Sequence, residues 1–224
     1  MNRHWRQAAW LFALAPISAL ITTATAAGPA KDDASESGWV SLFDGKTTEG
    51  WVALELPNQK QPSKWEVVDG MLVGSGGQSM IFSPRGDYTN FKFRAEVKIN
   101  DKGNSGMYFR TPKGNTFTNG YEAQINSTHA DPIKSGSIYT FVHIYDILVP
   151  PDTFFTQEVE VKDVNFRGKT VTNIKVRING KLLYEFNDFA RTWTTGHFAF
   201  QQHDPGSRVT IRKVEVMELP ATKK

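Results

Sequence analysis

The strongest constraint on this chain is the strict alternation of apolar and charged residues along 91–99, which read FKFRAEVKI. A two-residue period is that of a β-strand with one buried face and one face toward solvent. The segment NIKVRI at 173–178 repeats the alternation, and Asn179–Gly180 separates it from a third such run. Because both central residues of a type I′ turn need positive φ, this pattern predicts a β-hairpin.

The rest of the chain follows the same plan. Arg167–Lys169 marks a second hairpin turn, and 209–219 form a final predicted strand with a bulge near 212–213. Turn sequences recur about every ten residues, as in sandwiches and jelly rolls. The 15 Phe and 6 Trp can fill one large core, and without Cys the fold must be stable without disulfides. We therefore predict a single all-β domain over residues 39–220.

The N-terminus has the pattern of a secretory signal peptide over residues 1–26. Arg3 and Arg6 precede an apolar run at 8–21, and small residues at 24–26 form a cleavage site. The alternative is an uncleaved membrane anchor, but the run is shorter than the ~20 residues that a bilayer span needs. We expect a secreted or periplasmic protein with no stable membrane anchor after processing. Because the chain has no Cys, a lipoprotein anchor attached to Cys is excluded.

The net charge of the chain limits the classes of binding partner. The chain has a formal net charge of +3, and loss of Arg3 and Arg6 with the leader would leave +1. A nearly balanced chain argues against nucleic acid or an anionic membrane as the main partner. Residues 27–38 are small and polar, so we predict a disordered spacer there. Nothing in the pattern fixes an oligomeric state.

Two consecutive predicted strands carry polar residues of matching parity. In the first, Asn104, Tyr108 and Arg110 lie on one face; in the second, Glu122 and Gln124 oppose an apolar face. If the strands are neighbours, Arg110, Glu122 and Gln124 converge on one sheet face. The alternative is a solvated outer face whose Arg–Glu pair contributes little stability.

The histidines permit two interpretations. His203 ends a predicted strand and precedes an Asp-Pro-Gly turn, which suits a cleft rim, whereas His129 falls in a predicted loop. A lone His is often structural. A metal site formed by His203, His143 and a carboxylate stays an open alternative, because no ligand spacing identifies it.

The glycine-rich run 74–77 has no following Lys or helix, so we predict a flexible loop rather than a phosphate site.

An ordered set of short motifs resembles a known family. The motifs are LFDGK at 42–46, GW at 50–51, WEVVDGML at 65–72, NSG at 104–106, FR at 109–110, GYEAQI at 120–125, SGSIY at 135–139, NG at 179–180 and QH at 202–203. Together they resemble the 3-keto-disaccharide hydrolase domain family along nearly the whole chain after the leader. The chain departs from that pattern at 150–162, which lacks a Trp-Asn pair, and in its last strand.

The resemblance implies a concanavalin-like jelly-roll sandwich of two antiparallel sheets. It also implies a carbohydrate-active hydrolase or lyase that acts on glycosides already oxidised at C3. The C3 ketone acidifies the C2 proton, so the expected reaction is proton abstraction, elimination at C1 and hydration. The implied partner is a 3-keto-glycoside or related sugar, and a divalent metal could be required.

The family motifs also imply roles for individual residues. Glu122 is the candidate base or metal-binding carboxylate, and His203 is the candidate acid, base or metal ligand. His143 completes the candidate metal ligands. The implied substrate-binding residues are Asn104, Tyr108, Arg110, Gln124, Tyr139 and Gln202.

A different class of function uses the same fold, because jelly rolls also form lectins that bind sugar without reacting it. Such a module would rely on exposed aromatic side chains such as Trp51, Trp65 or Trp193. An interaction domain of the cell envelope is a third alternative. For a domain of this size we expect these tryptophans to lie in the core.

Overall fold

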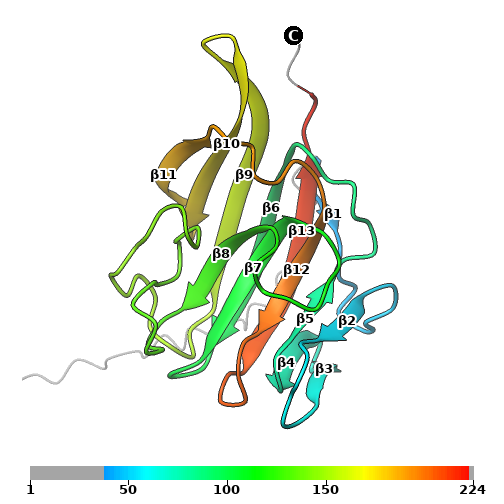
Figure 1. Ribbon diagram of the computed structural model, residues 1–224. Coiled ribbons are helices and arrows are strands. Elements are labelled where there is room, and N and C mark those ends of the chain that lie inside the picture. Colours follow the sequence, from blue (N-terminus) through cyan, green and yellow to red (C-terminus); the bar gives the residue numbers. More distant parts are fainter. Residues whose placement is uncertain (1–37, 222–224) are drawn as a thin grey trace, which may run out of the picture. The chain divides into compact units, whose positions relative to one another are not determined.

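The computed structural model describes residues 38–221, which form two antiparallel β-sheets with thirteen strands and no helix in that range (Figure 1). The predicted all-β jelly-roll sandwich is thereby confirmed. The predicted leader at 1–26 and nearly all of the predicted spacer at 27–38 lie outside the described residues. Within that range, no helix is long and apolar enough to cross a membrane.

The larger sheet contains eight strands. Seven of them follow one another in space as β11 (Lys181–Asp188), β10 (Lys169–Ile178), β9 (Phe155–Phe166), β6 (Phe91–Ile99), β13 (Val209–Glu218), β4 (Met71–Gly76) and β3 (Ser63–Val68). The eighth, β1 (Val40–Ser41), pairs with β13.

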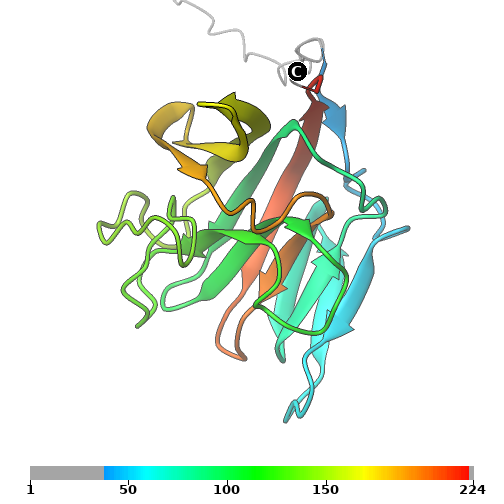
Figure 2. The same cartoon turned by 45° about the horizontal axis from the view of Figure 1, so that its top comes forward.

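The smaller sheet contains five strands and carries the polar segments singled out above. Their spatial order is β2 (Val52–Glu55), β5 (Ser79–Phe82), β12 (His197–Gln202), β7 (Asn104–Thr111) and β8 (Tyr121–Asn126). Figure 2 shows these strands as a second layer over the larger sheet. Strands β7 and β8 are neighbours, as the proposed convergence of their polar faces requires.

The alternating segment at 91–99 is β6 itself. Its odd-numbered residues are buried and its even-numbered residues are partly exposed along the whole strand. The inward residues meet β12, where Phe198 stacks on Phe93 with ring centroids 3.9 Å apart and meets Phe91 edge-on at 4.8 Å. Tyr88, from the segment before β6, lies 4.3 Å from the same ring. Phe198 is therefore the centre of an aromatic layer between the sheets.

The predicted hairpins are also present. Asn179 and Gly180 have φ values of 50° and 77°, and Arg167 and Gly168 have φ values of 52° and 83°, so both turns use two residues of positive φ. The predicted bulge in the last strand appears as a register shift between Ile211 and Lys213. These features are local, which is why the sequence pattern finds them.

The glycine-rich run at 74–77 was predicted to be a loop, and this is wrong for most of it. Gly74 and Gly76 belong to β4. A Cβ on Gly74 would lie 2.7 Å from the Trp65 ring, so this glycine makes room for tryptophan packing across the β3–β4 pair. Glycine in a strand often marks such a close approach.

We expect Phe198→Ala to lower the free energy of unfolding by about 3–5 kcal/mol, because it empties the centre of the aromatic layer. Urea unfolding followed by tryptophan fluorescence measures this. Phe189→Ala is the matched control, since this Phe is 63% exposed, and we expect a change within about 0.5 kcal/mol. Equal effects of the two changes would contradict the central place given to Phe198.

Candidate functional site

A pocket of about 280 Å³ opens on the face of the smaller sheet that points away from the core. Its wall includes polar side chains from three neighbouring strands and from the loops that follow them. The lining residues are Asn104, Phe117, Thr118, Gly120, Glu122, Gln124, Asp131, Tyr139, Thr140, Gln201 and His203. Five residues predicted from sequence thus lie around one cavity, and they come from β7, β8, the loop after β8 and the end of β12.

The direction of Glu122 follows from its neighbours in β8. Tyr121 and Ala123 are fully buried in the core between the sheets, so the intervening side chain points outward. The Glu122 side chain lies over β7, where its strand partner is Tyr108. A Cβ on Gly106 would collide with Glu122 Oε1, so the glycine of the NSG motif makes room for this carboxyl.

Glu122 is only 8% exposed, which is unusual for a carboxyl group. Burial raises its pKa to about 8, and the nearby charge of Asp131 adds to the effect, while hydrogen bonding with the Tyr108 hydroxyl opposes it. The group can therefore hold or release a proton near neutral pH, which is the property required of an acid or base catalyst.

Gln124 bonds to the Glu122 carboxyl, and Tyr108 lies beneath the pocket. The Gln124 amide, oriented with its nitrogen toward acceptors, donates to Glu122 Oε1 and to the Ser105 carbonyl, each at 3.1 Å. Tyr108 lies beneath the pocket, where its hydroxyl contacts the Phe117 carbonyl at 3.1 Å and accepts from Gln201 Nε2 at 3.0 Å. Tyr108 thus shapes the floor of the pocket rather than its lining.

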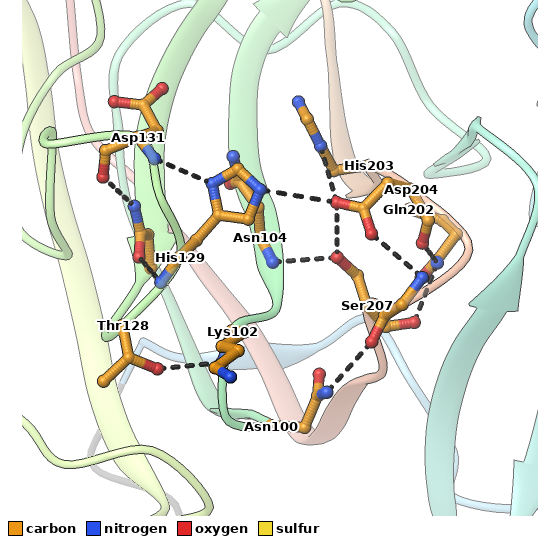
Figure 3. Close-up of polar contacts among 12 residues, drawn as sticks. Asn100, Lys102, Asn104, Thr128, His129, Asp131, Gln202, His203, Asp204 and Ser207 are labelled. Carbon is orange, nitrogen blue, oxygen red and sulfur yellow. Dashed lines mark hydrogen bonds and ion pairs between the residues drawn. The ribbon is translucent and has the colours of Figure 1, made fainter.

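The other side of the pocket is built by His203 and the turn that follows it. His203 Nδ1 lies 2.9 Å from Asp204 Oδ2, and His129 Nε2 lies 3.7 Å from the same oxygen. Figure 3 shows both rings in contact with this carboxylate. On the same rim, the Tyr139 hydroxyl donates to Asp131 Oδ2 at 3.1 Å.

This histidine cluster bears on the predicted metal. His129, His203 and Asp204 each offer one ligand atom, and these atoms lie within 4.8 Å of one another. However, His129 Nδ1 accepts the Asp131 backbone N–H at 3.0 Å, so the neutral ring carries its proton on Nε2, toward Asp204. A ligating imidazole normally does the reverse and donates through its second nitrogen. The arrangement therefore suits a hydrogen-bonded cluster better than a metal site.

The predicted metal set of Glu122, His203 and His143 is not brought together. His143 lies outside the pocket on an exposed loop, where its Nδ1 contacts the Tyr145 hydroxyl at 3.3 Å. No strand carries His143, since residues 143–151 of the described chain belong to no strand.

Arg110 was predicted to share the face of Glu122, and this is wrong. Between β7 and β12 the register shifts, so that two residues of β7 oppose one of β12. Arg110 takes a φ of 50° at this bulge and turns inward. Its guanidinium is buried, with bonds to Asp163 Oδ1 at 3.1 Å and to the Thr89 carbonyl at 2.9 Å. It joins the two sheets and does not line the pocket.

Gln202 was also predicted to bind substrate, but it does not line the pocket. Its amide donates to the backbone carbonyls of Asp204 at 2.7 Å and Ser207 at 2.9 Å. Its neighbour Gln201 lines the pocket instead. Because alternate residues of a strand face opposite sides, only one of the two glutamines can reach the cavity.

The prediction from sequence missed His129, Asp131 and Asp204. Each lies in a loop or turn, where side-chain direction follows no period. The only local signal was the Asp-Pro-Gly turn directly after His203, which we assigned to turn formation alone.

Residues 38–217 match the family model of the 3-keto-alpha-glucoside-1,2-lyase-like domain. A 3-keto-disaccharide hydrolase of Bacteroides thetaiotaomicron is 35% identical over 80 residues, which cover 32% of this chain and 27% of that protein. The chain therefore matches only about a quarter of that relative's length.

Solved structures agree on the fold. A Parabacteroides distasonis protein, provisionally described as a glycosyl hydrolase, superposes with a TM-score of 0.65 at 25% identity, covering 82% of this chain and 94% of its own. The carbohydrate-binding module CBM66 of Bacillus subtilis superposes with a TM-score of 0.56 at 17% identity, covering 75% and 96%. The second likeness concerns the fold alone.

The buried carboxyl predicts a pH dependence of stability. The folded chain keeps the Glu122 proton up to about pH 8, whereas an unfolded chain releases it near the ordinary pKa of about 4.3. The contribution of protonated Glu122 to the free energy of unfolding is therefore complete below the pKa of the unfolded chain, and it is lost as the pH rises through the pKa of the folded chain. Relative to Glu122→Gln, wild type should lose roughly 3 kcal/mol of unfolding free energy between pH 5 and 8.

Denaturant unfolding at a series of pH values tests this expectation. The control is Glu49→Gln, an exposed position outside the pocket, whose stability should follow that of wild type. Parallel curves for wild type and Glu122→Gln would show that Glu122 titrates normally.

Proposed function

The chain belongs to the 3-keto-alpha-glucoside-1,2-lyase-like domain family, and because of this membership we propose that it cleaves glycosides already oxidised at C3. The substrate would be a 3-keto-glycoside that enters the pocket between Glu122 and His203. The name of the matched Bacteroides relative supports the same substrate class.

The proposed chemistry needs one base and one acid. The base removes the proton at C2, and the electron pair of that C–H bond forms an enolate with the C3 carbonyl. The enolate then expels the oxygen at C1, which takes a proton from the acid. Water adds across the resulting C1–C2 double bond, with oxygen to C1 and a proton to C2, so the net reaction is hydrolysis.

The observation that carries this proposal is a buried carboxyl and an imidazole in one pocket. Glu122 has a pKa raised to about 8 by burial, and His203 lines the same cavity. A carboxyl of raised pKa and an imidazole in one cavity are the groups that an elimination and hydration sequence requires, whereas sugar binding alone requires neither.

Amide side chains supply the remaining polar contacts. Asn104 and Gln124 line the cavity. The Asn104 amide can donate to sugar hydroxyls or to the oxygen on which negative charge develops, whereas Gln124, whose amide nitrogen bonds to Glu122 and Ser105, offers its oxygen as an acceptor. Tyr139 offers a further oxygen at the rim. Arg110, implied by the resemblance to bind substrate, turns inward instead, so stabilisation of the enolate would fall to neutral donors such as the Asn104 amide.

A sugar-binding module without activity is the rival function, and the fold of CBM66 is compatible with it. The tryptophans on which that alternative depended do not favour it. Trp51, Trp65 and Trp193 are partly buried and pack against the core rather than forming an open sugar platform.

Export stays a prediction, because it rests on residues 1–26, which lie outside the described range. A cleaved leader would place the domain outside the cytoplasm, where glycans are first met. N-terminal sequencing of the protein recovered from the culture medium or periplasm would identify the cleavage site.

The decisive experiment is incubation of the purified protein with a 3-keto-glucoside that carries a chromogenic aglycone. Wild type should release the aglycone, and Glu122→Gln should release it about 10²–10⁴-fold more slowly, because proton transfer is lost. Glu49→Gln should match wild type. The corresponding glucoside without the ketone should remain intact.

Parallel reactions with chelator and with added divalent metals test the metal requirement. No release by folded wild type under any of these conditions would contradict the proposed function. Binding of the sugar without release, measured by calorimetry, would instead favour the lectin-like alternative.

A further inference from the structure

The Asp204 carboxylate is the centre of a hydrogen-bonded group beside the pocket. It accepts from His203 Nδ1, from the Ser207 hydroxyl and from the Gly206 backbone N–H, each at 2.9 Å. Burial opposes its ionisation, but these hydrogen bonds outweigh that effect and hold the pKa of Asp204 below its ordinary value. Asp204 is therefore an ionised group that only accepts hydrogen bonds.

This arrangement fixes the proton on the His203 ring. Because a carboxylate cannot donate, the His203 Nδ1 must carry the hydrogen that lies between them. The neutral ring then has its lone pair on Nε2, which points away from Asp204 (Figure 3). Within residues 38–221 no hydrogen bond engages Nε2, and the ring lines the cavity. A free lone pair beside a substrate pocket is the property of a base.

Three contacts keep Asp204 and the ring in place. The Ser207 hydroxyl that donates to Asp204 itself accepts the Asn104 backbone N–H at 2.8 Å, which ties the carboxylate to β7. His129 presents its Nε2 to Asp204 from the other side. Phe117 stacks on the His203 ring, with centroids 5.8 Å apart and planes at 19°.

We propose that His203 Nε2 is the base that removes the C2 proton, that Glu122 is the acid that protonates the leaving oxygen, and that Asp204 is the positioning residue that holds His203 in this tautomer. This assignment rests on the proposed function. The raised pKa of Glu122 supports it, because a carboxyl with a pKa of about 8 is mostly protonated at neutral pH.

The proton balance of the cycle is closed. His203 gains the C2 proton and becomes an imidazolium whose charge Asp204 stabilises, while Glu122 gives its proton to the aglycone oxygen. In the hydration step Glu122 takes a proton from the attacking water and His203 returns its proton to C2. Both residues end in their starting states, and no oxidant or reductant is consumed.

The tautomer can be measured without any substrate. In long-range ¹H–¹⁵N spectra of protein labelled at histidine, the His203 ring should show a protonated Nδ1 and an unprotonated Nε2. His203→Gln assigns the signals by their loss. A wild-type spectrum with the proton on Nε2 would overturn the proposal, whatever the variants do.

Asp204→Asn tests the positioning role, with Asp146→Asn as a matched control at an exposed position outside the pocket. Asp204→Asn should lose the single tautomer and lower kcat about tenfold or more, with KM within about threefold of wild type. Ser207→Ala, which keeps the carboxylate, should lower kcat less. Thermal unfolding verifies that each variant is folded.

The outcomes separate this inference from the proposed function. Activity on the 3-keto-glucoside with an unchanged tautomer and kcat in Asp204→Asn would overturn the inference and leave the proposed function standing. Absence of activity in wild type would overturn the assigned catalytic roles together with the proposed function, and the spectra would still decide whether Asp204 sets the tautomer.

Discussion

Phe93 and Phe198 stack face to face between the two sheets, and the orientation of the smaller sheet depends on this aromatic layer. Side chains alternate along a strand, so a strand that buries one set of residues must present the other set outward. In β8 the buried set includes Tyr121 and Ala123, and Glu122 is therefore directed to the outer face. A slip of one residue would exchange the two sets, and the large apolar area lost from the core makes such a slip costly.

The outer face becomes a pocket because loops cover part of it and small residues leave room. Gly106 has no side chain to compete with the Glu122 carboxyl, and Tyr108 fills the space beneath it. The carboxyl is thereby removed from water without a cation among the pocket-lining residues. This desolvation is the physical origin of its raised pKa, and it destabilises the folded state at high pH in return for a group that exchanges protons near neutrality.

Family membership and the site agree at the level of carbohydrate chemistry, but the site of this chain has features of its own. The histidine cluster depends on an Asp that directly follows His203 and on a loop that brings His129 to the same oxygen. Arg110, which the family resemblance implied as a substrate-binding residue, has a structural role instead. Proton exchange of an imidazole and a carboxyl with a bound substrate, with the Asn104 amide as a further donor, is the chemistry that this pocket supports best.

The sequence by itself determined the strands at 91–99, 173–178 and 209–219, the two hairpins, the bulge in β13 and the outward direction of Glu122 and Gln124. All of these follow from backbone rules that act over a few residues. Only the tertiary structure decided where Arg110 points, because a bulge against β12 reverses the parity of β7 at that residue. It alone brought His129 to Asp204 and excluded His143, because loops have no period and their side chains are placed by contacts between segments far apart in the sequence.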